Sequence, residues 1–457
     1  MERTLILDCN EKVGETVKLF GWVDSIRKHG KIAFIDLRDR TGIIQVFLRG
    51  EQLGEITPES VVSIEGQINQ RPEKLVNPKL PTGTIELSAE TIELISRSET
   101  PPFPIDTDGS EINEDIRLDY RYLDLRRTRM TQNLRFRHKV ITFIRNWLIE
   151  EGFVEIETPI MTKATPEGAR DFLIPSRLNP GKFYALPQSP QQYKQLLMVA
   201  GFERYFQIAR CFRDEDTRKD RQLEFTQLDI EMSFVDRESI MNIIEKLFTN
   251  LAEEFGYKLL NKPFPRITYQ DAMKKYGDDK FDMREDKDPN TLAFAWVIDQ
   301  PLFEWKEQEN RFDAMHHPFT NPNPEDLDQL YAGKYGEVRS WQYDLVCNGY
   351  EVGGGSIRIT DPKLQSKIFE IMGHSTEQIQ NKFGHLLRAF EFGVPPHGGM
   401  APGLDRLISI MRNEPTIREV IAFPTSSTGV SSVMNAPTPV DEDQLSDLGL
   451  SLNLKKK

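Results

Sequence analysis

Chemistry-bearing side chains are concentrated in the segment FRDEDTRKDRQLEFTQLDIEMSF, residues 212–234. Eight of its first ten residues are charged, and the two signs are mixed. The rest alternates with a period of two, which predicts a strand with Gln227, Asp229 and Glu231 on one face and apolar side chains such as Leu228 on the other. Because the apolar face is expected to be buried, the opposite face would line a polar cavity, where a carboxylate beside an amide could hold an ammonium group.

Cationic and amide side chains that could serve such a cavity come earlier in the chain. YFQIARCF is the expected antiparallel partner of the strand, so Arg213 would lie at the mouth of the hairpin. In LPQSPQQYKQLLM, Ser189 followed by proline predicts the start of a helix, and Gln191 and Lys194 share one face of its first turns. A lysine there opposes the helix macrodipole. It is either an ordinary surface lysine or part of a site for an anion.

Two later segments could handle a metal and phosphates. In YDLVCNGYEVGGGSIRI, Asp344 and Glu351 flank a strand-turn-strand unit and could share a magnesium ion, which prefers oxygen ligands. The run of three glycines is either a bulge or a surface that a ligand can approach closely, and Arg358 follows it. Arg406 opens a predicted helix in GLDRLISIM. Because the chain has no Walker P-loop and no GxGxxG motif, a phosphate site would depend on arginines.

Composition limits the class of protein. The chain has 457 residues, enough for two or three domains, with 38% hydrophobic and 28% charged residues. No apolar run is long enough to cross a membrane, and the three cysteines match no disulfide or zinc spacing, so we expect a cytoplasmic protein with reduced thiols. A net charge of −13 argues against general nucleic-acid binding. The basic strip at residues 117–139 is either a solvated helical face or a local site for a polyanion.

The elements that must position these residues fall into two parts. Short strands separated by glycine and proline are predicted at residues 16–24, 31–39, 42–49, 61–69 and 84–96. Five strands in this length fit an OB-fold barrel, whose second and third strands, with Phe34 and Gln45, often face an oligonucleotide. A proline-rich stretch follows, then an amphipathic helix at about residues 131–151, and a mixed α and β pattern to the end.

In order and spacing, these segments resemble the signature motifs of class II aminoacyl-tRNA synthetases, most closely the bacterial-type aspartyl-tRNA synthetases. FVEIETPIMTKATPEGARDF is similar to motif 1 and the lid after it, FRDED and RQLEFTQ to motif 2, and GLDRL to motif 3. QSPQQYKQLLM, AMHHPFT and GYEVGGGSIRI agree with the same family. The resemblance covers nearly the whole chain. It implies an α+β protein with a five-stranded OB-fold anticodon-binding barrel (1–103), a linker or hinge (104–130), and a catalytic domain whose antiparallel sheet is flanked by helices (131–457).

The resemblance implies ATP-dependent ligation of L-aspartate to tRNA(Asp) through an aspartyl-adenylate, with ATP and Mg2+, in a homodimer that needs no membrane. Motif 1 of this class ends in an interface proline, here Pro159. Histidine at the position of His29 accompanies members that also charge tRNA(Asn), which makes tRNA(Asn) a candidate second substrate. Anticodon contacts are expected from the barrel residues Arg27, His29, Phe34, Gln45 and Glu86.

The same resemblance assigns roles in the catalytic domain. Arg213 and Arg406 are the catalytic residues, at the α- and γ-phosphates of ATP, and Asp344 and Glu351 hold magnesium. The ATP site comprises Arg213, Glu215, Gln222, Phe225, Glu351 and Arg406, with Phe225 stacked on adenine. The aspartate site comprises Glu167 in the lid, Ser189, Gln191, Lys194, Asp229, His316, His317 and Arg358. Lys194 and Arg358 would meet the side-chain carboxylate of aspartate.

Two departures from the family pattern are present. The extra domain between motifs 2 and 3 of bacterial members is absent near residues 281–295, and Leu223 replaces the usual proline of motif 2, which should loosen that turn slightly. Two other functions fit parts of the sequence: an aspartate-adenylating ligase with a small acceptor, and a non-catalytic tRNA-binding paralogue. The intact barrel argues against the first. The presence of Arg213, Arg406 and both metal carboxylates argues against the second.

Overall fold

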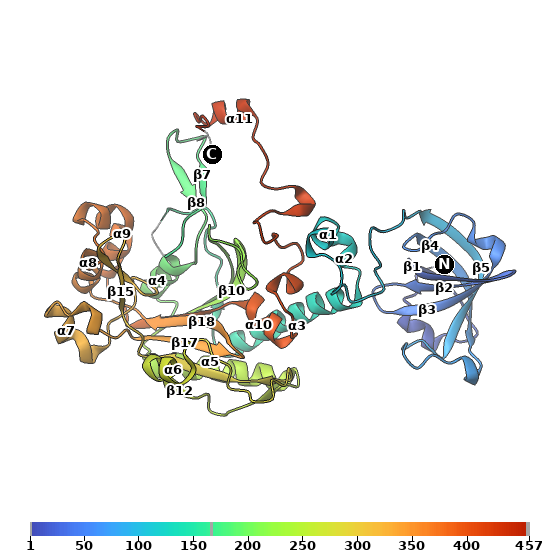
Figure 1. Cartoon of the computed structure of the whole chain (residues 1–457), viewed down its shortest axis with the longest axis horizontal. Helices are drawn as coiled ribbons and strands as arrows, with labels where there is room; N and C mark the ends of the chain where they lie inside the picture. The colour runs from blue at the N-terminus through green and yellow to red at the C-terminus, as the bar shows by residue number, and fades with distance from the viewer. Residues whose placement is uncertain (1, 165–167, 454–457) are drawn as a thin grey trace. The chain divides into compact units, whose positions relative to one another are not determined.

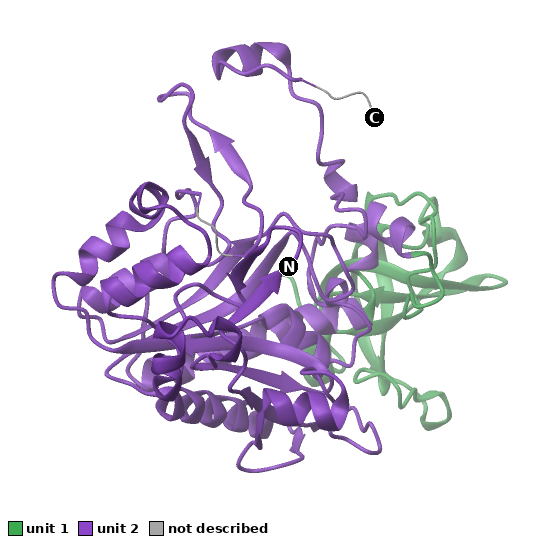
Figure 2. Ribbon diagram, turned by 60° about the vertical axis from the view of Figure 1, so that its left-hand side comes forward, with its two compact units in different colours: residues 1–113, 126–128 green, residues 114–125, 129–457 purple. Residues whose placement is uncertain are grey.

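The chain divides into two compact units in the computed structural model, which describes residues 2–164 and 168–453 (Figure 2). Unit 1 comprises residues 1–113 and 126–128, and unit 2 comprises residues 114–125 and 129–457. Within the described ranges, no helix has the length and apolar character that crossing a membrane would require.

Unit 1 is a closed barrel of five strands in the order β1-β2-β3-β5-β4 (Figure 1). The strands are β1 (Thr16–His29), β2 (Ile32–Arg38), β3 (Ile43–Arg49), β4 (Val61–Gln70) and β5 (Ile85–Ser96). Alternate side chains such as Ile35, Val46 and Ile64 fill the barrel and are fully buried. The five strands predicted from short strand-like runs between glycines and prolines are confirmed, and so is the OB-fold.

Unit 2 is built on an eight-stranded sheet in the order β12-β14-β17-β18-β19-β10-β9-β6. Its central pairs are antiparallel, as expected, whereas the outermost strands β12 and β6 pair in parallel with their neighbours. Its strands are β6 (Val154–Glu155), β9 (Arg204–Phe212), β10 (Glu224–Ser233), β12 (Arg266–Thr268), β14 (Phe294–Ile298), β17 (Gln342–Cys347), β18 (Tyr350–Ile357) and β19 (His397–Pro402). Two-stranded sheets are formed by β7 (Leu173–Pro175) with β8 (Phe183–Ala185), β11 (Lys258–Leu259) with β13 (Thr291–Leu292), and β15 (Phe303–Lys306) with β16 (Arg311–Ala314).

Helices cover both faces of this sheet. One face packs on a large apolar core with α3, α5 and α10, and a second core joins α4 to α8 and α9. The predicted amphipathic helix is α3, which begins slightly earlier than expected. The helices are α1 (Glu114–Asp119), α2 (Arg121–Asp124), α3 (Thr128–Glu150), α4 (Gln191–Val199), α5 (Arg237–Glu254), α6 (Tyr269–Tyr276), α7 (Leu327–Tyr331), α8 (Pro362–Ile371), α9 (Thr376–Phe390), α10 (Leu404–Met411) and α11 (Glu442–Asp447).

The basic strip is not a solvated or polyanion-binding surface at its N-terminal end. Arg117 and Arg121 are buried. Arg117 forms paired hydrogen bonds with Asp124 and with Glu419, and Arg121 also contacts Asp124. Buried guanidinium groups require such partners because an unpaired charge in the interior is costly. These arginines therefore attach the start of unit 2 to its C-terminal part.

The hairpin of β9 and β10 forms as predicted, with one difference at its end. Leu228 and Ile230 lie in the apolar core, but Phe234 is exposed because β10 ends at Ser233 and Phe234 has a positive φ of 58°. The helix expected at Ser189 starts with Pro190 as its N-cap instead.

Candidate active site

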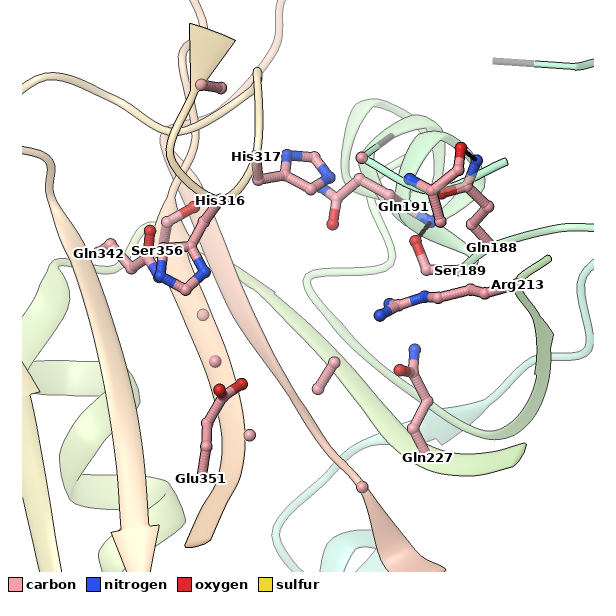
Figure 3. A pocket seen from close by; sticks show the side chains of 18 of the residues that line it. Gln188, Ser189, Gln191, Arg213, Gln227, His316, His317, Gln342, Glu351 and Ser356 are labelled. Carbon is pink, nitrogen blue, oxygen red and sulfur yellow. Dashed lines mark hydrogen bonds between the residues drawn. The ribbon is translucent and has the colours of Figure 1, made fainter. Parts of the chain in front are cut away.

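A cavity of about 680 Å³ lies over the polar face of the sheet in unit 2 (Figure 3). The sheet strands β10 and β18, the start of α4 and the loop after β16 contribute to its wall. Thirteen of the residues predicted from the sequence line it: Ser189, Gln191, Lys194, Arg213, Glu215, Gln222, Phe225, Asp229, His316, His317, Glu351, Arg358 and Arg406. Asp344 is not among the lining residues, and Glu167 lies outside the described residues.

Four buried charges form the base of the cavity. The ammonium of Lys194 lies 2.7 Å from Oδ1 of Asp229 and 3.2 Å from Oε2 of Glu231. Arg358 donates from Nε and Nη2 to the two oxygens of Glu231, at 2.9 and 3.0 Å. Lys194 is thus neither a surface lysine nor an unpaired cation. Buried carboxylates partner both cations, and the further contact with a substrate carboxylate stays a prediction.

The two carboxylates of this cluster differ in acidity. Burial acts to raise the pKa of Glu231, but Arg358 and then Lys194 outweigh it and lower that pKa to about 2. Burial raises the pKa of Asp229, against the opposing effect of Lys194. Glu231 is therefore a fixed anion. Asp229 is the weaker acid of the two and is held by Lys194.

His317 offers the cavity a neutral donor. Its Nδ1 accepts a hydrogen bond from the backbone N–H of Phe319 at 3.2 Å, so the ring proton is on Nε2. In the described part of the chain, Nε2 is buried and has no partner. Burial lowers the pKa of His317 well below its usual range, and the charges of Arg358, Lys194 and Arg213 lower it further. An N–H of this kind suits an acceptor such as a carboxylate oxygen.

Arg213 and Phe225 are stacked in the part of the cavity next to the hairpin. The guanidinium carbon of Arg213 lies 5.0 Å from the centre of the Phe225 ring. Figure 3 shows the Arg213 guanidinium extended into the cavity above the amide of Gln227. Glu215 accepts a hydrogen bond from Arg221 at 3.4 Å, and Gln222 is fixed by the segment around residue 425. An aromatic ring can stack on a flat base, and a guanidinium can pair with a phosphate group.

Arg406 lies at the start of α10, as predicted, and lines the cavity. It donates to the backbone oxygen of Glu351 and lies 3.1 Å from Oδ2 of Asp220. The neighbouring Asp405 accepts a hydrogen bond from the backbone N–H of Thr226 at 2.8 Å. Through Asp405, the helix that carries Arg406 is attached directly to the strand that follows Arg213.

The carboxylates expected to bind metal come from the neighbouring strands β17 and β18. The carboxylate of Glu351 is directed into the cavity (Figure 3) and lies 3.3 Å from Lys280. Burial, together with the charge of Glu351, raises the pKa of Asp344 to about 6, against the opposing charge of His316. Each oxygen of Asp344 accepts from a glutamine amide, of Gln300 or of Gln342.

These oxygen donors fit a magnesium ion that keeps most of its ligands from phosphates and water. The described residues contain no group of three or more His, Cys, Asp or Glu side chains that could hold a metal without such help. The backbone of Gly354 lies so close to Asp344 that a side chain would not fit: a Cβ on Gly354 would lie 2.6 Å from Oδ1 of Asp344. Glycine at this position therefore leaves room for the Asp344 carboxylate.

The barrel residues predicted to contact an anticodon form a second cluster, within unit 1. The amide of Gln45 donates to Glu86 at 2.8 Å and accepts from Arg27 at 3.3 Å. The ring of Phe34 lies on the same outer face, 6.2 Å from the ring of His29. All five predicted residues thus lie on one face of the barrel, where a half-buried ring beside fixed polar groups suits a single-stranded nucleic acid.

Several residues of both sites were not predicted. Asp36 holds Arg27 with paired hydrogen bonds on the barrel. In the cavity, Glu231 was placed on the polar strand face but not recognised as the counterion of Lys194 and Arg358. Gln195 lies one helical turn after Gln191, and this spacing was the only signal that could have identified it.

Comparisons with known proteins agree with this arrangement. The family described as tRNA synthetases class II (D, K and N) matches residues 113–427, and the OB-fold nucleic acid binding domain matches residues 17–95. An Aspartate--tRNA(Asp/Asn) ligase of Rubrobacter xylanophilus is 42% identical over 573 aligned positions, which cover 97% of this chain and 95% of the relative. One from Dehalococcoides mccartyi is 40% identical over 589 positions and covers 98% of both chains.

These alignments are longer than the 457 residues of this chain, so the relatives contain residues that have no counterpart here. Among solved structures, the asparaginyl-tRNA synthetase from Pyrococcus horikoshii complexed with asparaginyl-adenylate has a TM-score of 0.74 at 23% identity. The match covers 93% of this chain and 98% of that chain. At this identity the likeness concerns the fold.

Proposed function

The chain belongs to the class II tRNA synthetases (D, K and N), and from this premise we propose that it ligates L-aspartate to tRNA(Asp) and also to tRNA(Asn), through an aspartyl-adenylate. The observation that carries the proposal is the convergence of Lys194, Arg358 and the neutral donor His317 at one end of a cavity whose other parts present Arg213 and Arg406. A dicarboxylic amino acid and a nucleotide fit side by side in such a cavity.

In the first step, an oxygen of the α-carboxylate of aspartate attacks the α-phosphorus of ATP, and the bond to the β-phosphate breaks to release pyrophosphate. The attacking carboxylate is already ionised, so no protein base is required. Arg213 neutralises charge at the α-phosphate and Arg406 at the far end of the phosphate chain, while Phe225 supports the adenine. Reactions of this type depend mainly on positioning and charge stabilisation.

In the second step, a terminal hydroxyl of the tRNA attacks the carbonyl carbon of the adenylate, AMP leaves, and the hydroxyl proton is lost to the leaving phosphate or to water. Magnesium, when bound at Glu351 and Asp344, supplies positive charge to the phosphates. The barrel face around Phe34 and Gln45 is proposed to bind the anticodon, which fits its half-buried ring and oriented amides.

Selection of aspartate follows from the donors at the base of the cavity. Lys194, Arg358 and His317 offer only N–H groups, so the amide nitrogen of asparagine would face donors with its own N–H groups. An unsatisfied buried group beside charges costs about 3–5 kcal/mol, which is enough for discrimination of two or more decades.

A homodimer is proposed from the exposed edge of the main sheet. Both residues of β6 are exposed, and Ile160 and Met161 nearby are about half exposed, at 48% and 52%. An open strand edge with apolar neighbours favours contact with a second chain. Analytical ultracentrifugation should give twice the monomer mass, and substitution of Met161 by aspartate should shift the protein to the monomer.

The test of the function is ATP–pyrophosphate exchange with a panel of amino acids, followed by acylation of tRNA(Asp) and tRNA(Asn). We expect exchange with aspartate alone and acylation of both tRNAs. Exchange supported equally by asparagine would contradict the assigned donors. Exchange without acylation of either tRNA would instead favour an adenylating ligase with another acceptor.

A further inference from the structure

Gln195 and His397 support the cavity from behind, and neither of them is among the residues that line it. Both side chains are completely buried. Gln195 comes from α4 and His397 begins β19, so the two residues join a helix to the central sheet. Polar side chains in such a position are retained only where hydrogen bonds satisfy them.

Their contacts form a single chain of hydrogen bonds that ends at the cavity. Nδ1 of His397 lies 2.8 Å from the backbone oxygen of Pro395, and Nε2 lies 3.2 Å from Nε2 of Gln195. Oε1 of Gln195 accepts from Nε2 of Gln191 at 3.0 Å. Gln191 itself lines the cavity, and its amide oxygen is directed into the open space (Figure 3).

The chemistry of the first contact fixes the direction of every other one. A backbone carbonyl can only accept, so Nδ1 of His397 carries a proton. Burial lowers the pKa of His397, so the ring is neutral and its Nε2 is an acceptor. Gln195 must therefore turn its NH2 group toward His397 and its oxygen toward Gln191. A reversed amide at Gln195 would place an oxygen against the bare ring nitrogen.

This order determines what Gln191 can offer a ligand. Its NH2 group is used by Gln195, which leaves the oxygen as the group that faces the cavity. An amide oxygen accepts hydrogen bonds, so it recognises an N–H donor such as an ammonium group and not a carboxylate. Elsewhere in the same cavity, Lys194, Arg358 and His317 offer only hydrogen-bond donors, which prefer a carboxylate.

We propose that Gln195 and His397 are positioning residues that hold the Gln191 amide oxygen toward the α-ammonium group of the amino-acid substrate, an inference that rests on the proposed function. The orientation of the bound amino acid thus depends on Gln195 and His397, although neither of them touches the substrate. The two ends of aspartate are thus distinguished by donors on one side and a fixed acceptor on the other.

The test compares aspartate with succinate, which has both carboxylates but no ammonium group. In Gln195→Met, Gln191 is free to rotate, so we expect the KM for aspartate in pyrophosphate exchange to rise by about tenfold or more, as for one lost hydrogen bond to a charged group. The KM for ATP and the inhibition constant of succinate should remain unchanged. His397→Phe, which keeps a ring in the same space, should give the same pattern.

A control substitution, Gln329→Met in α7, removes a half-buried glutamine outside the cavity and should alter none of these constants. If Gln195→Met and His397→Phe raise the KM for aspartate and the inhibition constant of succinate by the same factor, the substitutions merely distort the cavity and the inference is wrong. An unchanged KM for aspartate would also overturn it. If the wild-type protein shows no aspartate-dependent exchange, the proposed function fails instead, which is a separate result.

Discussion

Lys194 and Arg358 meet at a single atom, Oε2 of Glu231, at 3.2 and 3.0 Å. The two cations come from a helix and from the end of a strand far away in the sequence, and neither could approach the other without the carboxylate between them. Glu231 therefore holds in place the pair of donors that the substrate carboxylate is proposed to meet.

Glu231→Gln should destabilise the protein in a pH-dependent manner. The pKa of Glu231 is about 2, below its usual value of 4.5, so the ionised group stabilises the fold above about pH 4.5, and this contribution is lost as the pH falls toward 2. A shift of this size corresponds to about 3 kcal/mol. Urea denaturation should show a large difference between wild type and variant near neutral pH that shrinks in acid. The exposed Glu337→Gln is the control, and a difference that does not vary with pH would contradict the prediction.

Arg406→Ala should reduce pyrophosphate exchange by roughly two decades or more, because removal of a charge-stabilising group at the phosphates raises the transition-state energy by several kcal/mol. Stability should change little, since Arg406 is partly exposed and its ion pair with Asp220 is at the surface. Arg388→Ala, an exposed arginine of α9, provides the control. Equal activity of the two variants would exclude Arg406 from the reaction.

Glu351→Gln should raise the Mg2+ concentration needed for half-maximal exchange by about tenfold or more, because the carboxylate that reaches the cavity becomes a weaker neutral ligand. Activity should recover in part at high Mg2+. A titration of Mg2+ at fixed ATP measures the effect. If the requirement is the same as in wild type, Glu351 is not a ligand of the metal.

The barrel should allow both tRNAs to be charged. We expect kcat/KM values for tRNA(Asp) and tRNA(Asn) that differ by less than about a thousandfold, and a variant of His29 that changes their ratio by roughly tenfold, as for one contact with a base. Acylation of the two purified tRNAs supplies the ratio. A preference of wild type beyond that limit would contradict dual specificity. Pyrophosphate exchange without tRNA should be the same in the wild type and in the His29 variant, and this measurement controls for damage to unit 2.

Local patterns were sufficient for much of the fold. Period-two alternation located β10, and short strand-like runs between glycines and prolines located the five barrel strands; each of these strands has one face in a core. The helix of Arg406 was likewise evident from its glycine and apolar spacing. Such signals depend on neighbours within one element, and most of these elements were predicted with nearly correct bounds, although β1 continues five residues past its predicted end.

Partners of buried charges could not be predicted, because they come from segments distant in the sequence. Arg117 appeared to be part of a basic surface, yet it is paired with Glu419, 302 residues later. Glu231 was placed on the right strand face but not recognised as the partner of Lys194 and Arg358. The contact of Gln195 with His397 spans 202 positions. Composition gives no sign of these pairs, since only tertiary packing decides which charges meet.

The hydrogen bond from the backbone N–H of Thr226 to Asp405 joins the start of α10, which carries Arg406, to β10, the strand that follows Arg213. If the two arginines bind opposite ends of the phosphate chain as proposed, this bond helps to set the distance between their backbones. ATP should then bind more tightly than ADP or AMP, whose shorter phosphate chains reach only one of the two arginines.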